Sequence, residues 1–113
     1  MSRDWRLYLD DLVEACEKIV RFLQDKEQAA LITDELLRDA LLRNLEVIGE
    51  AAAHIPDHVK SLSPDIDWVN IKGLRNIIAH QYFELDDDVL WDIVIHEVPG
   101  LLGQARALYQ INE

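Results

Sequence analysis

The chain has 113 residues, which is enough for one compact domain with a single core, over residues 1–113. Half of its residues are apolar, 29% are charged, and glycine and proline number only 4 and 3, a composition that excludes disordered, collagen-like and low-complexity proteins. The 22 acidic residues outnumber 11 basic ones and give a net charge of −11, so the surface as a whole should repel nucleic acid at long range.

Apolar residues recur at steps of three and four along most of the chain, which is the spacing of amphipathic helices. The first such stripe predicts a helix from about Asp4 to Gln24 and places Cys16 in the core. A second helix is predicted to follow Thr33 as its N-cap. It should end before Pro56, because proline lacks an amide donor.

The second half of the chain continues this pattern. Residues 56–67 are expected to form a connection with one short turn of helix, and residues 68–81 a third long helix. A fourth helix should start at residues 86–88 and reach a kink or break at residues 99–100. No strand pattern is present, so we predict an all-α fold, an up-and-down bundle of four to five helices. Such a thin, apolar-rich bundle is expected to bury part of a helix face against a second copy.

Two further features suggest where the protein resides. The single cysteine excludes an internal disulfide, and a reducing intracellular compartment is then the default. No apolar run reaches the roughly 18 residues that a membrane span needs, and the first residues lack the apolar core of a signal peptide. We therefore expect a cytoplasmic protein with no membrane contact.

One segment, residues 68–83, contains no acidic residue, although acids are frequent elsewhere. On a helical wheel its polar face carries Lys72, Arg75, Asn76 and His80, with glycine and alanine between them. Arginine offers a planar fork of donors for phosphate oxygens, and neutral histidine takes or gives a proton near neutral pH. These residue types support cleavage of a phosphodiester without a metal.

Spacing alone leaves a non-catalytic interpretation open. Arg75 and His80 are five residues apart, or about 140° around a straight helix, so they are not stacked neighbours. They would meet through the length of the arginine, through distortion at the helix end, or across a two-fold dimer axis. Otherwise they form a solvated face or have structural roles.

The other candidate residues point to sites less strongly. His54 and His58 have the spacing of a helical metal site, but a proline lies between them and no third ligand is apparent, so we predict no metal there. Residues 86–88 fit a helix start better than a cation site. Glu50 is expected to be a surface acid or a buried partner for an arginine, and His96 has no evident companion.

The motif and its surroundings resemble a known family. The run Arg75-Asn76-Ile77-Ile78-Ala79-His80-Gln81-Tyr82 is similar to the R-x4-H-x-Y motif of HepT-like toxins, members of the HEPN superfamily of ribonucleases. The family's usual surroundings are matched in order by Arg43–Ala52, Trp68 with Ile71, Asp86–Trp91 and Pro99. This resemblance covers nearly the whole chain. It implies a HEPN-like homodimer whose two motifs face each other across the two-fold axis and form one RNase cleft.

The resemblance also assigns roles to the motif residues. His80 would act as general acid or base on the 2′-hydroxyl or the leaving 5′-oxygen, and Arg75 would stabilise charge on the pentacoordinate phosphorus. Asn76, one helical turn before His80, would fix the imidazole or bind a phosphate oxygen, and Lys72 would support RNA binding. The expected product is a 2′,3′-cyclic phosphate, and neither a metal nor a cofactor is required.

A protein partner is implied as well. In that family a minimal nucleotidyltransferase antitoxin, MntA, neutralises the toxin by transferring AMP to the motif tyrosine, here Tyr82. The added phosphate would block the cleft and pair with Arg75. The function expected from the resemblance is a type II toxin that cleaves tRNA or mRNA. The alternative is a non-catalytic helical dimer that binds a nucleotidyltransferase, a nucleotide or RNA.

Overall fold

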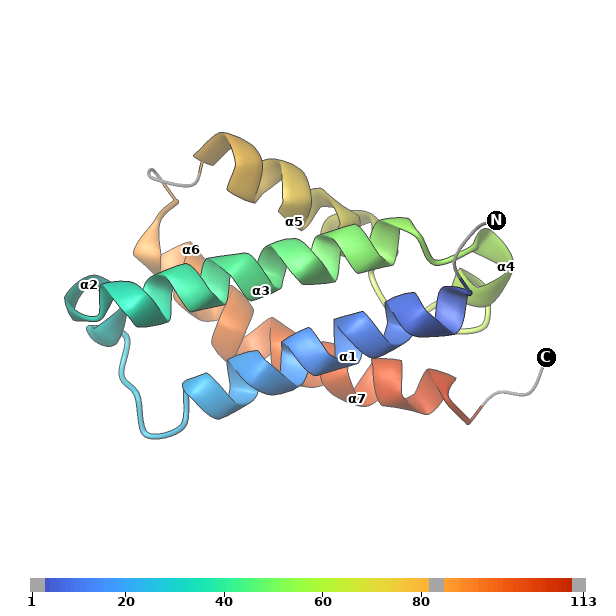
Figure 1. Ribbon diagram of the computed structural model, residues 1–113, viewed down its shortest axis with the longest axis horizontal. Helices are drawn as coiled ribbons and strands as arrows, with labels where there is room; N and C mark the ends of the chain where they lie inside the picture. The colour runs from blue at the N-terminus through green and yellow to red at the C-terminus, as the bar shows by residue number, and fades with distance from the viewer. Residues whose placement is uncertain (1–3, 82–84, 111–113) are drawn as a thin grey trace.

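The computed structural model describes residues 4–81 and 85–110, with the side chains of residues 79–81 excepted. These residues form an all-helical bundle without strands, as predicted (Figure 1). In chain order the elements are α1 (Trp5–Phe22), α2 (Ala30–Thr33), α3 (Glu35–Ala53), α4 (Asp57–Lys60), α5 (Trp68–Gln81), α6 (Asp87–Asp92), the π-helical turn η1 (Ile93–Glu97) and α7 (Val98–Leu108). None of the helices within the described ranges is long and apolar enough to cross a bilayer.

Helix α3 lies at the centre of the arrangement, between α1 and α5 (Figure 1). α1 also packs against α7, and one continuous core of buried aliphatic side chains joins these helices. Cys16 lies fully buried in this core, which confirms its predicted place. α5 packs mainly against α3, so it forms one edge of the bundle.

The start of α3 differs from the prediction. Asp34, and not Thr33, is its N-cap, and one Asp34 carboxylate oxygen accepts a hydrogen bond from the Leu37 amide at 3.0 Å. The predicted Thr33 cap is wrong because the four residues before Asp34 form the short helix α2. Inside that helix Thr33 donates its hydroxyl to the carbonyl of Ala29 at 3.2 Å.

The connection to α5 contains the single helical turn α4, as predicted. The indole of Trp68 anchors the start of α5 to this connection, because its N–H lies 3.3 Å from the carbonyl of Lys60 and 3.2 Å from that of Ser63. The Asp67 carboxylate accepts a hydrogen bond from the backbone amide of Asn70, in the first turn of α5, at 3.2 Å. α5 therefore begins at the predicted residue.

Of the kink or break predicted at residues 99–100, the break does not occur. The chain remains helical from Asp87 to Leu108, and the wider turn η1 directly precedes the proline. Pro99 has no amide to donate to the carbonyl of Ile95, and its ring would crowd that carbonyl in a regular α-helix. A π-helical turn relieves both problems. The ribbon changes direction between α6 and α7 without interruption (Figure 1).

Candidate active site on the polar face of α5

A glycine on α3 sets how closely α5 approaches. A Cβ atom built on Gly49 would lie 2.9 Å from the backbone nitrogen of Arg75 and 3.2 Å from the carbonyl oxygen of Ile71. Backbone atoms inside a helix cannot move aside as the end of a flexible side chain can. Gly49 therefore permits the close contact that places Arg75 beside α3.

The next residue on α3 provides the charged partner of this arginine. Nη1 of Arg75 donates to Oε2 of Glu50 at 2.5 Å. The Arg75 side chain is 41% exposed and that of Glu50 is 51% exposed, so the pair lies at the surface. Of the two alternatives predicted for Glu50, the surface acid is confirmed; it does pair with an arginine, but at the surface and not in a buried position. The hydrogen bond from Arg75 lowers the pKa of Glu50, so the carboxylate stays ionised to a more acidic pH than an isolated glutamate would.

A second contact holds Glu50 from the other side. Nε2 of His54 lies 3.5 Å from Oε1 of Glu50, and the imidazole packs edge-on against the ring of Tyr8, with centroids 4.6 Å apart. A chain of contacts therefore runs from α1 through α3 to Arg75. His54 thus contacts both Glu50 and Tyr8. No cluster of three metal-ligating side chains is found among the described residues.

The outer face of α5 carries the other predicted residues whose side chains are described. Lys72 and Asn76 are exposed, while Ile78 is buried on the opposite side against the core. The backbone of His80 belongs to the last turn of α5, but its side chain lies outside the described part of the structure, and so does all of Tyr82. The pairing of Arg75 with His80 and the modification of Tyr82 stay predictions.

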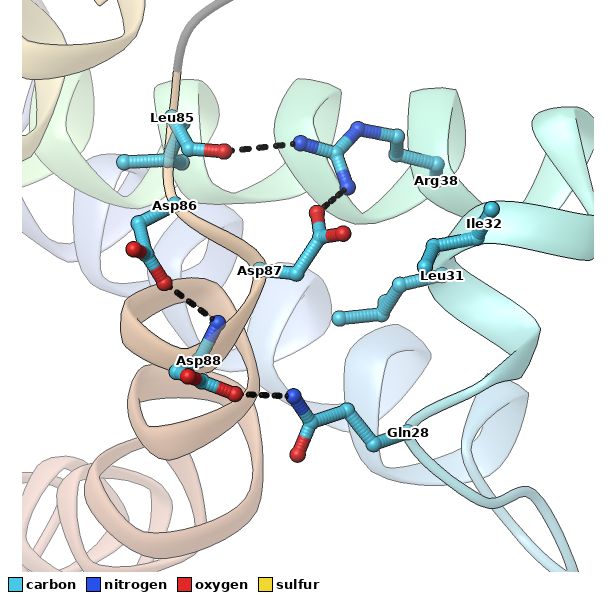
Figure 2. Close-up of a pocket in the computed structure, with 8 residues that line it drawn as sticks. All are labelled: Gln28, Leu31, Ile32, Arg38, Leu85, Asp86, Asp87 and Asp88. Carbon is cyan, nitrogen blue, oxygen red and sulfur yellow. Dashed lines mark hydrogen bonds and ion pairs between the residues drawn. The ribbon is translucent and has the colours of Figure 1, made fainter.

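Arg38, a residue of α3, contacts the residues just before and at the start of α6 (Figure 2). Its guanidinium forms an ion pair with Asp87, and its Nη2 donates to the carbonyl of Leu85 at 3.1 Å. The Asp88 carboxylate also accepts a hydrogen bond from the side-chain amide of Gln28, just before α2. These contacts fix residues 85–88 to α3 and to the turn before α2.

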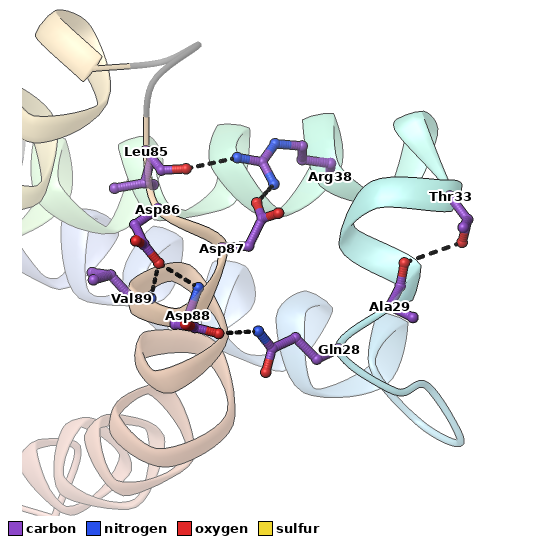
Figure 3. Close-up of polar contacts among 9 residues, drawn as sticks. All are labelled: Gln28, Ala29, Thr33, Arg38, Leu85, Asp86, Asp87, Asp88 and Val89. Atoms are coloured by element: carbon purple, nitrogen blue, oxygen red, sulfur yellow. Dashed lines mark hydrogen bonds and ion pairs between the residues drawn. The ribbon is translucent and has the colours of Figure 1, made fainter.

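The acidic run 86–88 is a helix start, as predicted (Figure 3). The Asp86 carboxylate caps α6 by accepting the backbone amides of Asp88 at 2.7 Å and Val89 at 3.4 Å. An open hollow of about 700 Å³ lies between this run and Arg38. Each of the three acids accepts a hydrogen bond or ion pair from a protein donor, which accounts for their place at the start of α6.

Sequence reasoning did not identify Arg75 as the arginine that pairs with Glu50, and it did not foresee the contacts of Arg38 with Leu85 and Asp87. Glu50 is 25 residues from Arg75, and Arg38 is 47 residues from Leu85, so no local spacing connects either pair. One signal was available for the first pair, because Glu50 follows a glycine in the block that resembles the family. His96, for which no companion was expected, contacts Asp92 one turn earlier, with Nδ1 3.0 Å from the carboxylate.

The buried thiol of Cys16 is a poor nucleophile at neutral pH. Burial of Cys16, strengthened by the charge of Glu17, raises the pKa of the thiol to about 12. The thiolate form is therefore scarce at neutral pH. The described surface with the chemistry to hold a phosphate is the polar face of α5, where the cations of Lys72 and Arg75 stand with the amide of Asn76.

Comparison with known proteins bears on this site. The family described as Ribonuclease HepT-like matches residues 12–108. A protein named "Probable ribonuclease HepT" from Thermococcus cleftensis is 36% identical over 108 residues, which cover 96% of this chain and 98% of that protein. A protein named "Putative RNase" from Methanocaldococcus jannaschii is 36% identical over 100 residues, covering 88% of this chain and 92% of that protein. No solved structure matches the chain. This chain belongs to the HepT-like ribonuclease family.

Proposed function

We propose that this chain is a metal-independent endoribonuclease, the toxin of a type II toxin–antitoxin pair. The observation that carries the proposal is the family match over residues 12–108, which includes the motif from Arg75 to Tyr82. The position of Arg75 supports it, because the arginine stands at the surface of α5 with its backbone fixed against Gly49.

In the proposed reaction His80 takes the proton of the 2′-hydroxyl, or gives one to the leaving 5′-oxygen. The 2′-oxygen attacks phosphorus, the bond from phosphorus to the 5′-oxygen breaks, and the products are a 2′,3′-cyclic phosphate and a 5′-hydroxyl. Arg75 stabilises the additional negative charge on the pentacoordinate phosphorus. Its bond to Glu50 uses Nη1, and a guanidinium has further N–H donors for phosphate oxygens. Lys72 and Asn76 bind neighbouring phosphates.

We further propose that the cleft is completed by a second copy. α5 lies at the edge of the bundle, and its polar face with Lys72 and Asn76 is exposed. Two such faces around a two-fold axis would double the local positive charge, and salt screens the more distant acids beyond about 10 Å. This would allow RNA to approach a molecule whose net charge is −11.

The proposed antitoxin is a nucleotidyltransferase that transfers AMP to Tyr82. The phosphate of the AMP would bring negative charge to the face that holds Arg75, and the nucleoside would occupy the cleft. Both effects would prevent RNA from binding.

The decisive experiment measures RNA cleavage by the unmodified protein, whose mass is first verified by mass spectrometry. We expect purified protein to cleave tRNA or mRNA in EDTA and to leave 2′,3′-cyclic phosphate ends, and we expect His80→Ala to abolish cleavage. Intact RNA after incubation with the wild type, or equal cleavage by His80→Ala, would show that the proposed activity is wrong.

A non-catalytic dimer that holds RNA, a nucleotide or a nucleotidyltransferase is the second candidate. The contact between Arg75 and Glu50 favours it, because the carboxylate neutralises much of the arginine's charge. This candidate predicts RNA binding without cleavage, unchanged by His80→Ala and weakened by Arg75→Ala.

A further inference from the structure

A groove on the other side of α5 has no role in the proposed reaction. It encloses about 530 Å³ between α5 and the segment formed by η1 and α7. Ile71, Leu74 and Ile77 line it from α5, and Ile93 and Leu101 line it from the opposite wall. On the helical wheel these three residues of α5 lie opposite Lys72 and Asn76. The groove and the polar face can therefore be occupied at the same time.

The apolar lining is accessible and not sealed by the fold. Ile77 is 39% exposed, although the sequence pattern places it on the apolar face of α5. Gly100 forms part of the wall, and a Cβ atom built there would meet no heavy atom within 4 Å. The turn η1, which relieves Pro99, contributes Ile93 and Glu97 to the same wall. The groove thus offers aliphatic surface that the isolated chain leaves in water.

The charges around the groove are of one sign. Asp65, Asp67 and Glu97 line it, and among the side chains that the structure describes no lysine, arginine or histidine does. The carboxylate of Asp65 is held by the hydroxyl of Ser63 at 3.0 Å, and hydrogen bonding from Ser63 lowers the pKa of Asp65. The carboxylate of Asp67 is held by Asn70 at 2.6 Å. Two of the three negative charges are therefore fixed in place before any ligand arrives.

We propose that this groove binds an amphipathic, positively charged helix of a partner protein. Its aliphatic side chains would pack between Ile77 and Ile93, and its lysine or arginine side chains would reach Glu97 and the two aspartates. Burial of the apolar surface supplies the affinity, and the matching charges select a cationic segment. The net charge of −11 would speed the approach of such a partner and repel nucleic acid or an anionic membrane from the groove.

The test uses a synthetic, fluorescein-labelled peptide of about four helical turns, with leucine on one face and lysine beside it, and a matched peptide with glutamate in place of lysine. Fluorescence anisotropy with the full-length protein should show binding of the lysine peptide and at least about tenfold weaker binding of the glutamate peptide. We expect Ile77→Ser to weaken binding about fivefold or more, and Glu97→Gln about threefold.

Matched controls test whether the groove itself is used. Val89→Ser removes a similarly exposed aliphatic side chain, and Glu27→Gln removes one exposed charge, both outside the groove. We expect neither to change binding, and we expect the methyl resonances of Ile77 and Ile93 to shift when the lysine peptide is added. Equal weakening by the control variants would overturn the proposal in favour of diffuse charge attraction. Dissociation of a dimer by Ile77→Ser, seen by light scattering, would instead make the groove an interface between copies and overturn it too.

Discussion

Gly49 and Glu50 are neighbours on α3 that act on Arg75 in different ways. The glycine admits the backbone of Arg75, and the glutamate orients its guanidinium. An arginine that stabilises a transition state must be held where the charge develops, since a flexible side chain loses entropy when it is fixed by the substrate. This two-residue support explains how an exposed arginine on an edge helix keeps a defined position.

Gly49→Ala should therefore destabilise the fold. The new methyl group would press on the Arg75 nitrogen from 2.9 Å and push α5 away from α3, at a cost of about 1–3 kcal/mol that outweighs the helix propensity of alanine. Gly103→Ala on α7 is the matched control, because its Cβ would meet no heavy atom within 4 Å. That variant should gain about 0.5–1 kcal/mol. Urea denaturation measures the free energy of unfolding of both variants. If Gly49→Ala had the same free energy of unfolding as the wild type, the close approach of α5 to α3 would be contradicted.

Glu50→Ala and Glu50→Gln separate orientation from charge. The glutamine keeps an oxygen acceptor for Arg75, so it should retain most of the RNA cleavage rate, while the alanine should lower kcat about tenfold with little change in KM. Glu46→Ala is the control on the same helix, where Glu46 pairs with Arg43 at 3.7 Å. Similar rates for wild type and Glu50→Ala, in a protein that cleaves RNA, would remove Glu50 from the site without affecting the proposed activity.

The same ion pair predicts a pH dependence of stability. Because Arg75 lowers the pKa of Glu50 in the folded chain, the pair stabilises the fold at pH values above the unfolded pKa of 4.5, and this contribution is lost as the pH falls through the lower folded pKa. The difference in free energy of unfolding between wild type and Glu50→Gln should be small at pH 7, since the pair is exposed. At pH 3 this difference in free energy of unfolding should be smaller than at pH 7. A difference that is larger at pH 3 would contradict a stabilising ion pair between Arg75 and Glu50.

At the scale of the elements, the sequence predicted those parts whose causes are local. α5 was predicted at its observed bounds because Asp67, Trp68 and the apolar spacing all lie within a few residues of one another. The cap of α3 was misplaced by one residue because α2 was not foreseen. The π-helical turn before Pro99 was likewise missed, since a proline inside a helix gives no local sign of whether the chain will break or widen.

The link between α3 and α6 belongs to this scale as well. Arg38→Ala should cost about 1–3 kcal/mol, because the side chains of Arg38 and Asp87 are only 20% and 33% exposed and the carboxylate would lose its partner. Amide hydrogen exchange should accelerate in the first turn of α6. Arg43→Ala, whose side chain is 71% exposed, is the matched control and should leave both unchanged. An unaltered exchange rate in Arg38→Ala would show that the Asp86 cap and the contact of Gln28 with Asp88 secure the start of α6 without Arg38.

At the scale of the whole molecule, the acidic surface repels RNA whereas the basic face of α5 attracts it. A chain of net charge −11 should bind bulk RNA poorly, so cleavage depends on the small area where positive charge is concentrated. The proposed cleft shared by two copies would resolve this conflict, since each copy would add its own Lys72 and Arg75. A single copy would offer one lysine and one partly neutralised arginine.

A mixing experiment tests the shared cleft. Arg75→Ala and His80→Ala homodimers should each be inactive, whereas a heterodimer of the two retains one arginine and one histidine in the same cleft. Co-expressed and purified with two affinity tags, the heterodimer should therefore cleave RNA measurably faster than either homodimer, although more slowly than wild type. Because the two inactive homodimers are compared on the same RNA, contaminating nucleases are controlled for. An inactive heterodimer beside an active wild type, or a wild type that scatters light as a monomer at micromolar concentration, would require each copy to work with its own Arg75 and His80. The angle of about 140° between those residues would then have to be closed within one α5.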